Sequence, residues 1–144
     1  MAVAERNDPY TGFMFQVEIQ GLILAGFSEV SGLQMETETH DFREGGVNDY
    51  MHKLPSGSKQ TNITLKRGLT DSDTLWKWHQ GVVNGKIERK SGRIIMMDAE
   101  GNENWHWTFE GAYPVKWQGP DFKADSSTAA IETLELAHKG IKKG

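Results

Sequence analysis

The sequence predicts a mainly β protein with a single α-helix. Most of the chain alternates apolar and polar side chains with a period of two, which is typical of strands that bury one face. One segment, 73–84, has a helical period instead. The 144 residues are enough to bury the core of one domain. We therefore expect a single domain over 1–144, with an N-terminal extension over about 1–10.

The first strands are predicted before residue 45. Residues 13–19 alternate apolar and polar side chains, and 22–27 is a short apolar piece. Residues 31–40 alternate again, with Leu33 and Met35 on one side. The opposite side is hydrophilic and is formed by Gln34, Glu36, Glu38 and His40.

A loop is predicted over 45–59, because Pro55 and Gly57 disfavour regular structure there. After it, Ile63 and Leu65 alternate with polar side chains, which indicates another strand. The polar positions of this strand are Asn62, Thr64 and Lys66. The alternating stretches on either side of the loop can pair as an antiparallel hairpin.

The helix is predicted from its ends and its period. Asp73 supplies an N-terminal cap, and Gly85 supplies a left-handed stop. Leu75, Trp78 and Val82 recur with helical spacing between them. Further strands are expected at 86–88, 93–98, 105–110, 113–117 and 131–138.

Composition excludes several classes of protein. A net charge of −4 and a pI near 5.7 argue against a nucleic-acid-binding surface, which needs clustered Lys and Arg. No apolar run is long enough to span a membrane, so we expect no membrane anchoring. The N-terminus lacks the apolar segment of a signal peptide, which predicts a protein made and folded in the cytoplasm. The chain has no cysteine, hence no disulfide or thiolate site.

No catalytic, cofactor or metal site is expected. The five histidines have no spacing that would place two imidazoles on one metal ion. The stretch "LPSGSK" lacks the spacing of a phosphate-binding loop. The carboxylates of Glu36 and Glu38 are better explained as a solvated strand face than as an acid–base pair. The tryptophans are better explained as core residues than as a stacking platform.

Several motifs together carry a family resemblance. They are "GFMFQVEI", "FSEVSGL", "FREGG", "HKLPSGSKQTNITLKRGLT", "LWKWHQ", "RIIMMD", "AYPVKWQGPDF" and "AIETLELAHKGI", and they extend from Asn7 to Ile141. In order and spacing they resemble the inner tube proteins of contractile phage tails and of extracellular contractile injection systems.

The resemblance implies two packed antiparallel sheets with one flanking helix, assembled as hexameric rings. Hairpins of neighbouring subunits would join into a barrel of about 24 strands around an open channel. The first hairpin would pair 31–44 with 60–68, and the second would involve 105–110 and 131–138. Leu33 and Met35 would pack toward the subunit's own core. The lumen would be lined by Gln34, Glu36, Glu38, His40, Asn62, Thr64 and Lys66, and an acidic lumen would weakly repel polyanions.

The function implied is mechanical. Stacked rings would form a rigid tube that sheath contraction drives through a target envelope, with protein effector cargo in the lumen. The implied partners are other copies of the chain, the sheath protein, baseplate or initiator tube proteins, a terminal cap and a tape-measure protein. The particle would be assembled in the bacterial cytoplasm and then released or attached to a membrane.

Contacts between subunits or rings are expected at the loop and at the basic C-terminus. The residues proposed for them are Asp49, Tyr50, His52, Lys53, Lys139, Lys142 and Lys143. The alternatives are a loop ordered only on assembly and a solvated terminus.

Other functions remain open at this point. The chain could be the tail tube of a contractile phage, which passes DNA, or the hexameric tube protein of a type VI secretion system. A third alternative is a monomeric module that binds carbohydrate through its tryptophans.

Overall fold

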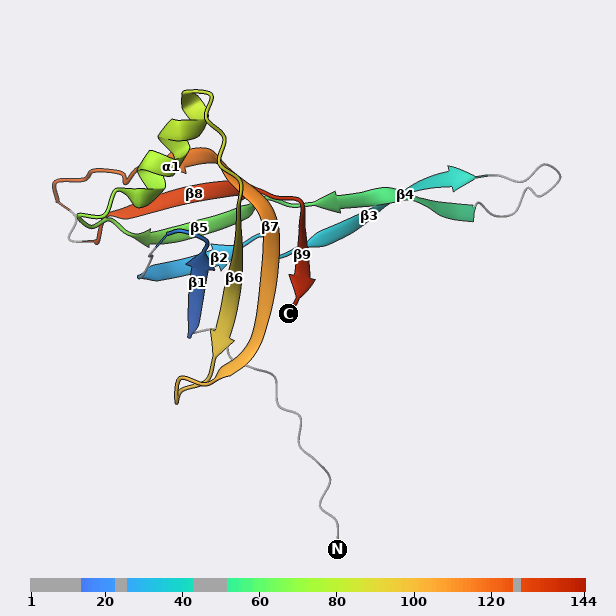
Figure 1. The fold of residues 1–144 in the computed structure, drawn as a ribbon, viewed down its shortest axis with the longest axis horizontal. Coiled ribbons are helices and arrows are strands. Elements are labelled where there is room, and N and C mark those ends of the chain that lie inside the picture. The colour runs from blue at the N-terminus through green and yellow to red at the C-terminus, as the bar shows by residue number, and fades with distance from the viewer. Residues whose placement is uncertain (1–13, 23–25, 43–51, 126–127) are drawn as a thin grey trace, which may run out of the picture.

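The structure is a computed structural model that describes residues 14–22, 26–42, 52–125 and 128–144; for 40–42 and 52–58 it describes the backbone alone. Figure 1 shows the elements in order. They are β1 (Phe15–Ile19), β2 (Phe27–Ser31), β3 (Met35–Phe42), β4 (His52–Gln60), β5 (Ile63–Gly68), α1 (Thr74–Val83), β6 (Lys90–Met97), β7 (Glu103–Gln118), β8 (Ile131–Ala137) and β9 (Gly140–Lys143). No helix in this part of the chain is long and apolar enough to cross a membrane.

The two predicted antiparallel sheets are confirmed, and they share the long strand β7, which was not predicted. The first half of β7 pairs with β6 on one side and β9 on the other, and β1 completes this sheet beside β6. The second half of β7 pairs with β8, followed by β5 and β2. Gly111, with a φ of 61°, lies between the two halves. A single strand therefore curves from one sheet into the other (Figure 1).

The core lies between the sheets and under the helix. It is formed by Val17, Ile19, Ile94 and Phe109 of the first sheet, Ile63, Leu65, Ala112, Leu134 and Leu136 of the second, Ile141 of β9, and Leu75 and Trp78 of α1. The predicted start of a strand at residue 93 is wrong, because β6 begins at Lys90 and runs through Ser91 and Gly92. The ring of Phe109 fills the place of a side chain at Gly92, where a Cβ would lie 2.4 Å from it. Residues 86–88 form no strand.

The helix α1 confirms the predicted period and ends. Leu75 and Trp78 are buried, and the indole N–H of Trp78 donates to the Glu88 carbonyl at 2.9 Å. Gly85 has a φ of 84°, which is the left-handed stop. Asp73 occupies the N-cap position without a capping hydrogen bond; its carboxylate instead pairs with Lys77, 3.4 Å away.

Strands β3 and β4 form a two-stranded ribbon, here called the arm, which projects from the body (Figure 1). The arm continues β2 and β5, which pair with each other inside the body. The predicted pairing of 31–44 with 60–68 is therefore wrong in register. Met35 lies opposite Gln60, so β3 pairs with 52–60, while β5 pairs with 27–31 and β8.

The predicted loop over 45–59 is wrong for 52–59, which belongs to β4; residues 45–51 lie outside the described residues. Pro55 and Gly57 are tolerated because the register shifts between them, opposite Glu38 and Thr39. A bulge accommodates irregular backbone, and a two-stranded ribbon leaves one side of each strand without ladder bonds. Proline's missing N–H therefore costs little at such a site.

The predicted partnership of 105–110 with 131–138 is also wrong. β8 lies beside Tyr113–Gln118, the second half of β7. The first half pairs with β6 and with the C-terminal strand, where Phe109 lies opposite Ile141. The alternating pattern predicts both strands but does not reveal that β7 changes partner at its bend.

Candidate functional site: a polar sheet face and a projecting arm

The described residues contain no cluster of three His, Asp or Glu side chains that could hold a metal ion. The histidines make separate local contacts. His106 pairs with Glu103 at 2.6 Å, and His138 Nε2 lies 2.8 Å from the Thr61 carbonyl. Glu103 and His106 both belong to β7, whereas the His138 contact joins the residue after β8 to the segment between β4 and β5; neither contact brings a nucleophile or a second acid to the ring.

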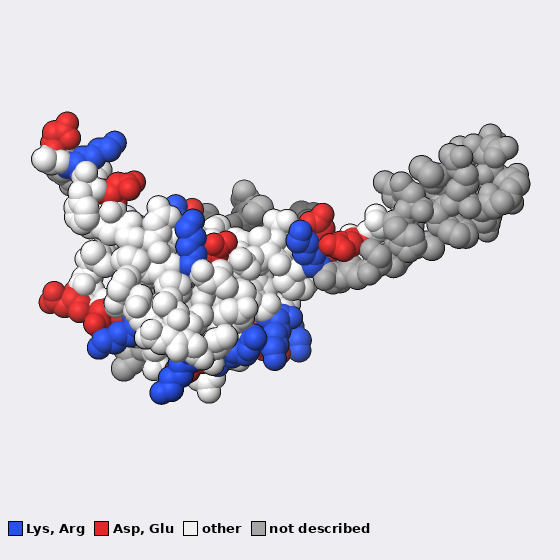
Figure 2. Space-filling model, turned by 90° about the horizontal axis from the view of Figure 1, so that it is seen from above, with Lys and Arg blue, Asp and Glu red and all other residues white. Residues whose placement is uncertain are grey.

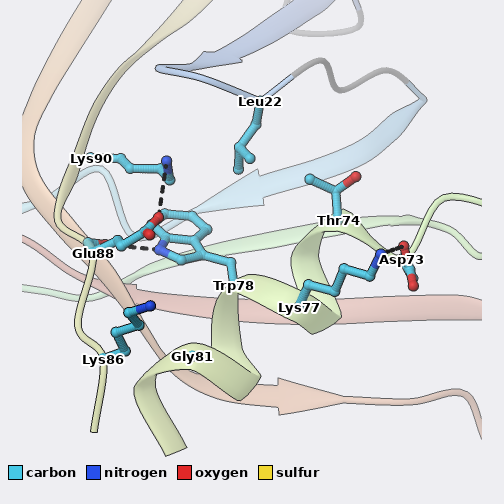
Figure 3. A pocket seen from close by; sticks show the side chains of 9 residues that line it. All are labelled: Leu22, Asp73, Thr74, Lys77, Trp78, Gly81, Lys86, Glu88 and Lys90. Atoms are coloured by element: carbon cyan, nitrogen blue, oxygen red, sulfur yellow. Dashed lines mark hydrogen bonds and ion pairs between the residues drawn. The ribbon is translucent and has the colours of Figure 1, made fainter. Parts of the chain in front are cut away.

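A cavity of about 320 Å³ lies beside α1 (Figure 3). Four of the five charged side chains that line it form two ion pairs, Lys77 with Asp73 and Lys90 with Glu88 at 3.6 Å, and the fifth is Lys86. Trp78 forms one wall and uses its N–H in the bond to the Glu88 backbone. The cavity is therefore a groove that separates the helix from the strands, with no group poised for chemistry.

The second sheet has one apolar and one polar face. Ile63, Leu65 and Arg67 of β5 are buried, and the alternate positions Asn62, Thr64 and Lys66 lie on the opposite face. Their cross-strand partners are polar as well. Glu29 of β2 lies opposite Lys66, with 3.5 Å between their charged atoms, and Glu135 of β8 lies opposite Thr64. The Asn62 amide donates to Glu135 at 3.4 Å.

The arm continues this polar face beyond a break in the alternation at Gly32. Val30 and Leu33 line a common cavity although they are three residues apart, because Gly32 has a φ of 92° and shifts the phase. Leu33 and Met35 then line a small cavity with Trp107 and Ile141. By alternation Gln34, Glu36 and Glu38 lie on the other side, which continues the polar face. Of His40 only the backbone is described.

The prediction that Leu33 and Met35 pack into the subunit's own core is wrong for the isolated chain. Met35 is 65% exposed and Leu33 is 37% exposed. The arm leaves the body at this point, so the side chains meet only the edge of the first sheet. Their apolar surface remains available.

Together the sheet and the arm form one polar face, which consists of Glu29, Ser31, Gln34, Glu36, Glu38, Lys59, Asn62, Thr64, Lys66, Lys116, Thr133 and Glu135. Lys59 belongs to it because it lies opposite Glu36, and Lys116 because it lies opposite Glu135. Its four glutamates and three lysines give a formal charge of −1 (4 negative, 3 positive). The described face is therefore mixed in charge, with a small negative net charge.

Comparison with known families assigns the chain. Residues 11–142 match the family model described as T4-like virus tail tube protein gp19. The chain belongs to this tail tube family. The match includes both sheets, the helix and the arm, so the family assignment applies to the whole described fold. Among curated proteins there is no significant sequence match.

Solved structures of contractile systems share the fold of this tail tube family member. A chain of the PVC extracellular contractile injection system sheath–tube complex in the extended state is 26% identical, with a TM-score of 0.85 over 94% of this chain and 91% of that one. A chain of the anti-feeding prophage cap is 23% identical, with a TM-score of 0.88 over 99% and 95%. Hcp1 from Flavobacterium johnsoniae is 22% identical, with a TM-score of 0.65 over 92% and 95%.

The residues predicted to contact other subunits fall in two places. Asp49 and Tyr50 lie outside the described residues, and His52 and Lys53 are described only as backbone of β4. The C-terminal lysines have partners within the chain. Lys142 lies 3.8 Å from Glu110, Lys143 lies over the ring of Trp105 at 4.4 Å, and Lys139 packs beside Gly111. The contacts of these lysines fasten β9 to β7 in the single subunit.

The sequence analysis missed part of the polar face. Glu29, Lys116 and Glu135 belong to it, and only cross-strand register reveals this. The alternation of 131–137 was a usable signal for Glu135. Glu132, which the sequence analysis did not single out, lies on the buried side of β8. Trp105 and Trp76 keep 37% and 42% of their surface exposed, so the expected core role holds for Trp78 but is incomplete for these two.

Proposed function

We propose that this chain is the inner tube subunit of a contractile injection system, in which hexameric rings stack into a hollow tube. The observation that carries the proposal is the arm. Within the described residues β3 pairs only with β4, so each strand has one long edge without ladder bonds. Unpaired strand edges are completed by other strands. No other described strand pairs with the arm, so we propose that another chain supplies the missing strands.

The apolar side of the arm supports the same conclusion. Leu33 and Met35 remain exposed where the arm leaves the body. Burying them against a neighbouring subunit would contribute about 25 cal/mol for each Å² of apolar surface removed from water. Head-to-tail contacts of this kind close into a ring when the rotation between subunits permits.

The polar face lines the lumen in this proposal. It lies opposite the core in every strand of the second sheet, and a barrel of many strands encloses water rather than packed side chains. Its mixed charge suits passage of cargo, because neither polyanions nor polycations meet a strong field of one sign. The lumen-facing set then includes the predicted Gln34, Glu36, Glu38, Asn62, Thr64 and Lys66, with His40 further along the arm.

The partners follow from the structural relatives. These relatives come from a sheath–tube complex, a baseplate, a tube-terminating cap and a sheath/tube terminator. We propose that this tube contacts a sheath, starts on a baseplate and ends at a cap. A tape-measure protein would set its length, and effector proteins would travel inside it. Assembly would take place in the bacterial cytoplasm, before the particle is released or attached to a membrane. The role is structural, with no reaction catalysed.

An injection system is favoured over a type VI secretion tube by the degree of structural similarity. TM-scores to chains of injection systems are 0.84 to 0.88, against 0.53 to 0.65 for the Hcp-type proteins. The second candidate is a phage tail tube that passes DNA, which the family description favours. Capsid and terminase genes beside this gene would indicate the phage; sheath and baseplate genes without them would indicate the injection system.

Electron microscopy of an arm-deleted variant tests the proposal. Because Met35 and Gln60 are direct partners, residues 36–59 can be replaced by an Asn-Gly turn that joins them. We expect full-length protein, purified alone or with its sheath and baseplate, to form six-fold rings or hollow rods. The shortened chain should keep its β-sheet circular dichroism and remain monomeric. Rings without the arm, or full-length monomers even beside the partner proteins, would refute the proposal.

A further inference from the structure

Phe122 is the most exposed large apolar side chain among the described residues, with 88% of its surface accessible. It belongs to the segment that connects β7 to β8. This segment projects from the body on the side away from the arm, as Figures 1 and 2 show. Asp121 and Lys123 flank it and are exposed as well. The Phe122 ring therefore buries little apolar surface within its own subunit.

An open apolar cavity lies between the two sheets. It has a volume of about 290 Å³, and its apolar lining is Phe15, Val30, Leu33, Ile94, Met96 and Trp107. A cavity of roughly 150 Å³ is already large enough to bind benzene. One phenyl ring therefore fits, and the surrounding side chains offer it aromatic and thioether contacts. Ser28 and Glu29 form the polar part of the rim.

The ring and the cavity lie near opposite ends of β7. Trp107 is in the first half of the strand, and the Phe122 segment begins after its last residue, Gln118. β7 bends between them at Gly111, and Phe122 keeps most of its surface exposed, so the ring does not occupy the cavity of its own chain. A second copy of the chain offers the same ring and the same cavity.

We infer that Phe122 of one subunit inserts into the cavity between the sheets of another subunit. This inference rests on the proposed function, and it names a contact through which the copies assemble. The rims are complementary in charge. Lys123 beside the ring can face Glu29, and Asp121 can face Lys66, the ion-pair partner of Glu29. Because the Phe122 ring and the cavity lie at different places on one chain, their contact is head-to-tail, the type of contact that builds rings and stacks.

Cross-linking through engineered cysteines tests the contact, because the chain has no cysteine of its own. The variant carries Ser28→Cys at the cavity rim and Lys123→Cys beside Phe122, and both substitutions leave Phe122 and the apolar lining intact. Treatment of assembled protein with a short bis-maleimide should give a ladder of covalent oligomers on a denaturing gel. The matched control combines Ser28→Cys with Val83→Cys, an exposed helix position with 62% of its surface accessible. This control should give at least tenfold less cross-linked product.

A second variant tests whether the Phe122 ring itself is needed for the two cysteines to come close enough to cross-link. Adding Phe122→Ser to the reactive pair should abolish most of the ladder, whereas adding Val83→Ser should not. A ladder that survives Phe122→Ser would overturn the inference. So would rings or tubes that form normally and give no ladder, and the proposed function would then stand. Protein that stays monomeric throughout would overturn both. If Phe122→Ser reduced only sheath binding, the ring would face the sheath and the inference would be wrong.

Discussion

The Arg67 guanidinium lies 2.5 Å from the Glu132 carboxylate inside the core, where the two side chains are 3% and 1% exposed. Both groups have further partners. The indole N–H of Trp117 donates to the second oxygen of Glu132 at 3.0 Å, and Arg67 donates to the Ser72 carbonyl at 3.2 Å. One buried ion pair therefore links β5, β8, β7 and the segment that leads into α1.

Breaking this pair should destabilise the subunit strongly. Arg67→Ala leaves the Glu132 carboxylate buried without its cation, which should lower the free energy of unfolding by about 4 kcal/mol. The matched control is Lys66→Ala, the next residue of the same strand, which loses only the half-exposed pair with Glu29 and should cost about 1 kcal/mol or less. Urea unfolding followed by circular dichroism measures both. Equal losses would show that the buried pair has no special role.

The junction between body and arm should not tolerate a side chain at Gly32. Its φ is 92°, and a Cβ there would lie 2.1 Å from the Asn62 carbonyl oxygen, so that β2 and β5 would have to separate. Gly32→Ala should therefore cost well over the roughly 1 kcal/mol of a simple left-handed penalty. Gly26→Ala is the control, because its φ is also positive, at 79°, but no atom of the described residues lies within 4 Å of the added Cβ. Thermal unfolding of the two variants gives the comparison, and equal shifts would contradict the close approach.

Cargo passage should respond to the charge of the polar face. Glu36→Lys with Glu38→Lys changes its described formal charge from −1 to +3 in each subunit, since each reversal adds two. An anionic cargo should then be retained after contraction, because fields of one sign add within a channel. The fraction of cargo left in contracted particles is the measurement. The control is Glu100→Lys in the exposed turn between β6 and β7. Unchanged loading and ejection would count against the lumen assignment.

The turn between β6 and β7 should become less stable in acid through Asp98. Its carboxylate accepts backbone N–H bonds from Asn102 at 2.8 Å and Glu100 at 2.9 Å, and these bonds lower its pKa below the ordinary 3.8. A lowered folded-state pKa contributes stability that is present above 3.8 and is lost as the pH falls through the folded value. Asp98→Ala should thus lower the Tm at pH 7, and the difference from the natural chain should shrink below pH 4. A difference independent of pH would exclude the carboxylate as the cause.

Much of the fold was predictable because strands and the helix each leave a local pattern of apolar and polar side chains. The alternation at 13–19, 63–66 and 105–110 predicted β1, β5 and the first half of β7, since each strand buries one face. Leu75, Trp78 and Gly85 predicted the helix and its end. The polar positions Asn62, Thr64 and Lys66 were predicted to share a face, and they lie opposite the buried Ile63 and Leu65.

The sequence by itself determined most of the strands, the helix and the family that the motifs resemble, because these depend on the spacing of side chains along the chain. It did not predict β4, where Pro55 and Gly57 disfavour regular structure, or the short strand β9. Only the tertiary structure decided how the strands pair. Register at a bulge let Pro55 lie in β4, the bend at Gly111 gave β7 two sets of partners, and Glu132 became a core residue when β5 brought Arg67 to it. Pairing and burial depend on residues far apart in sequence, and the energy of a buried charge is defined only once its partner is in place.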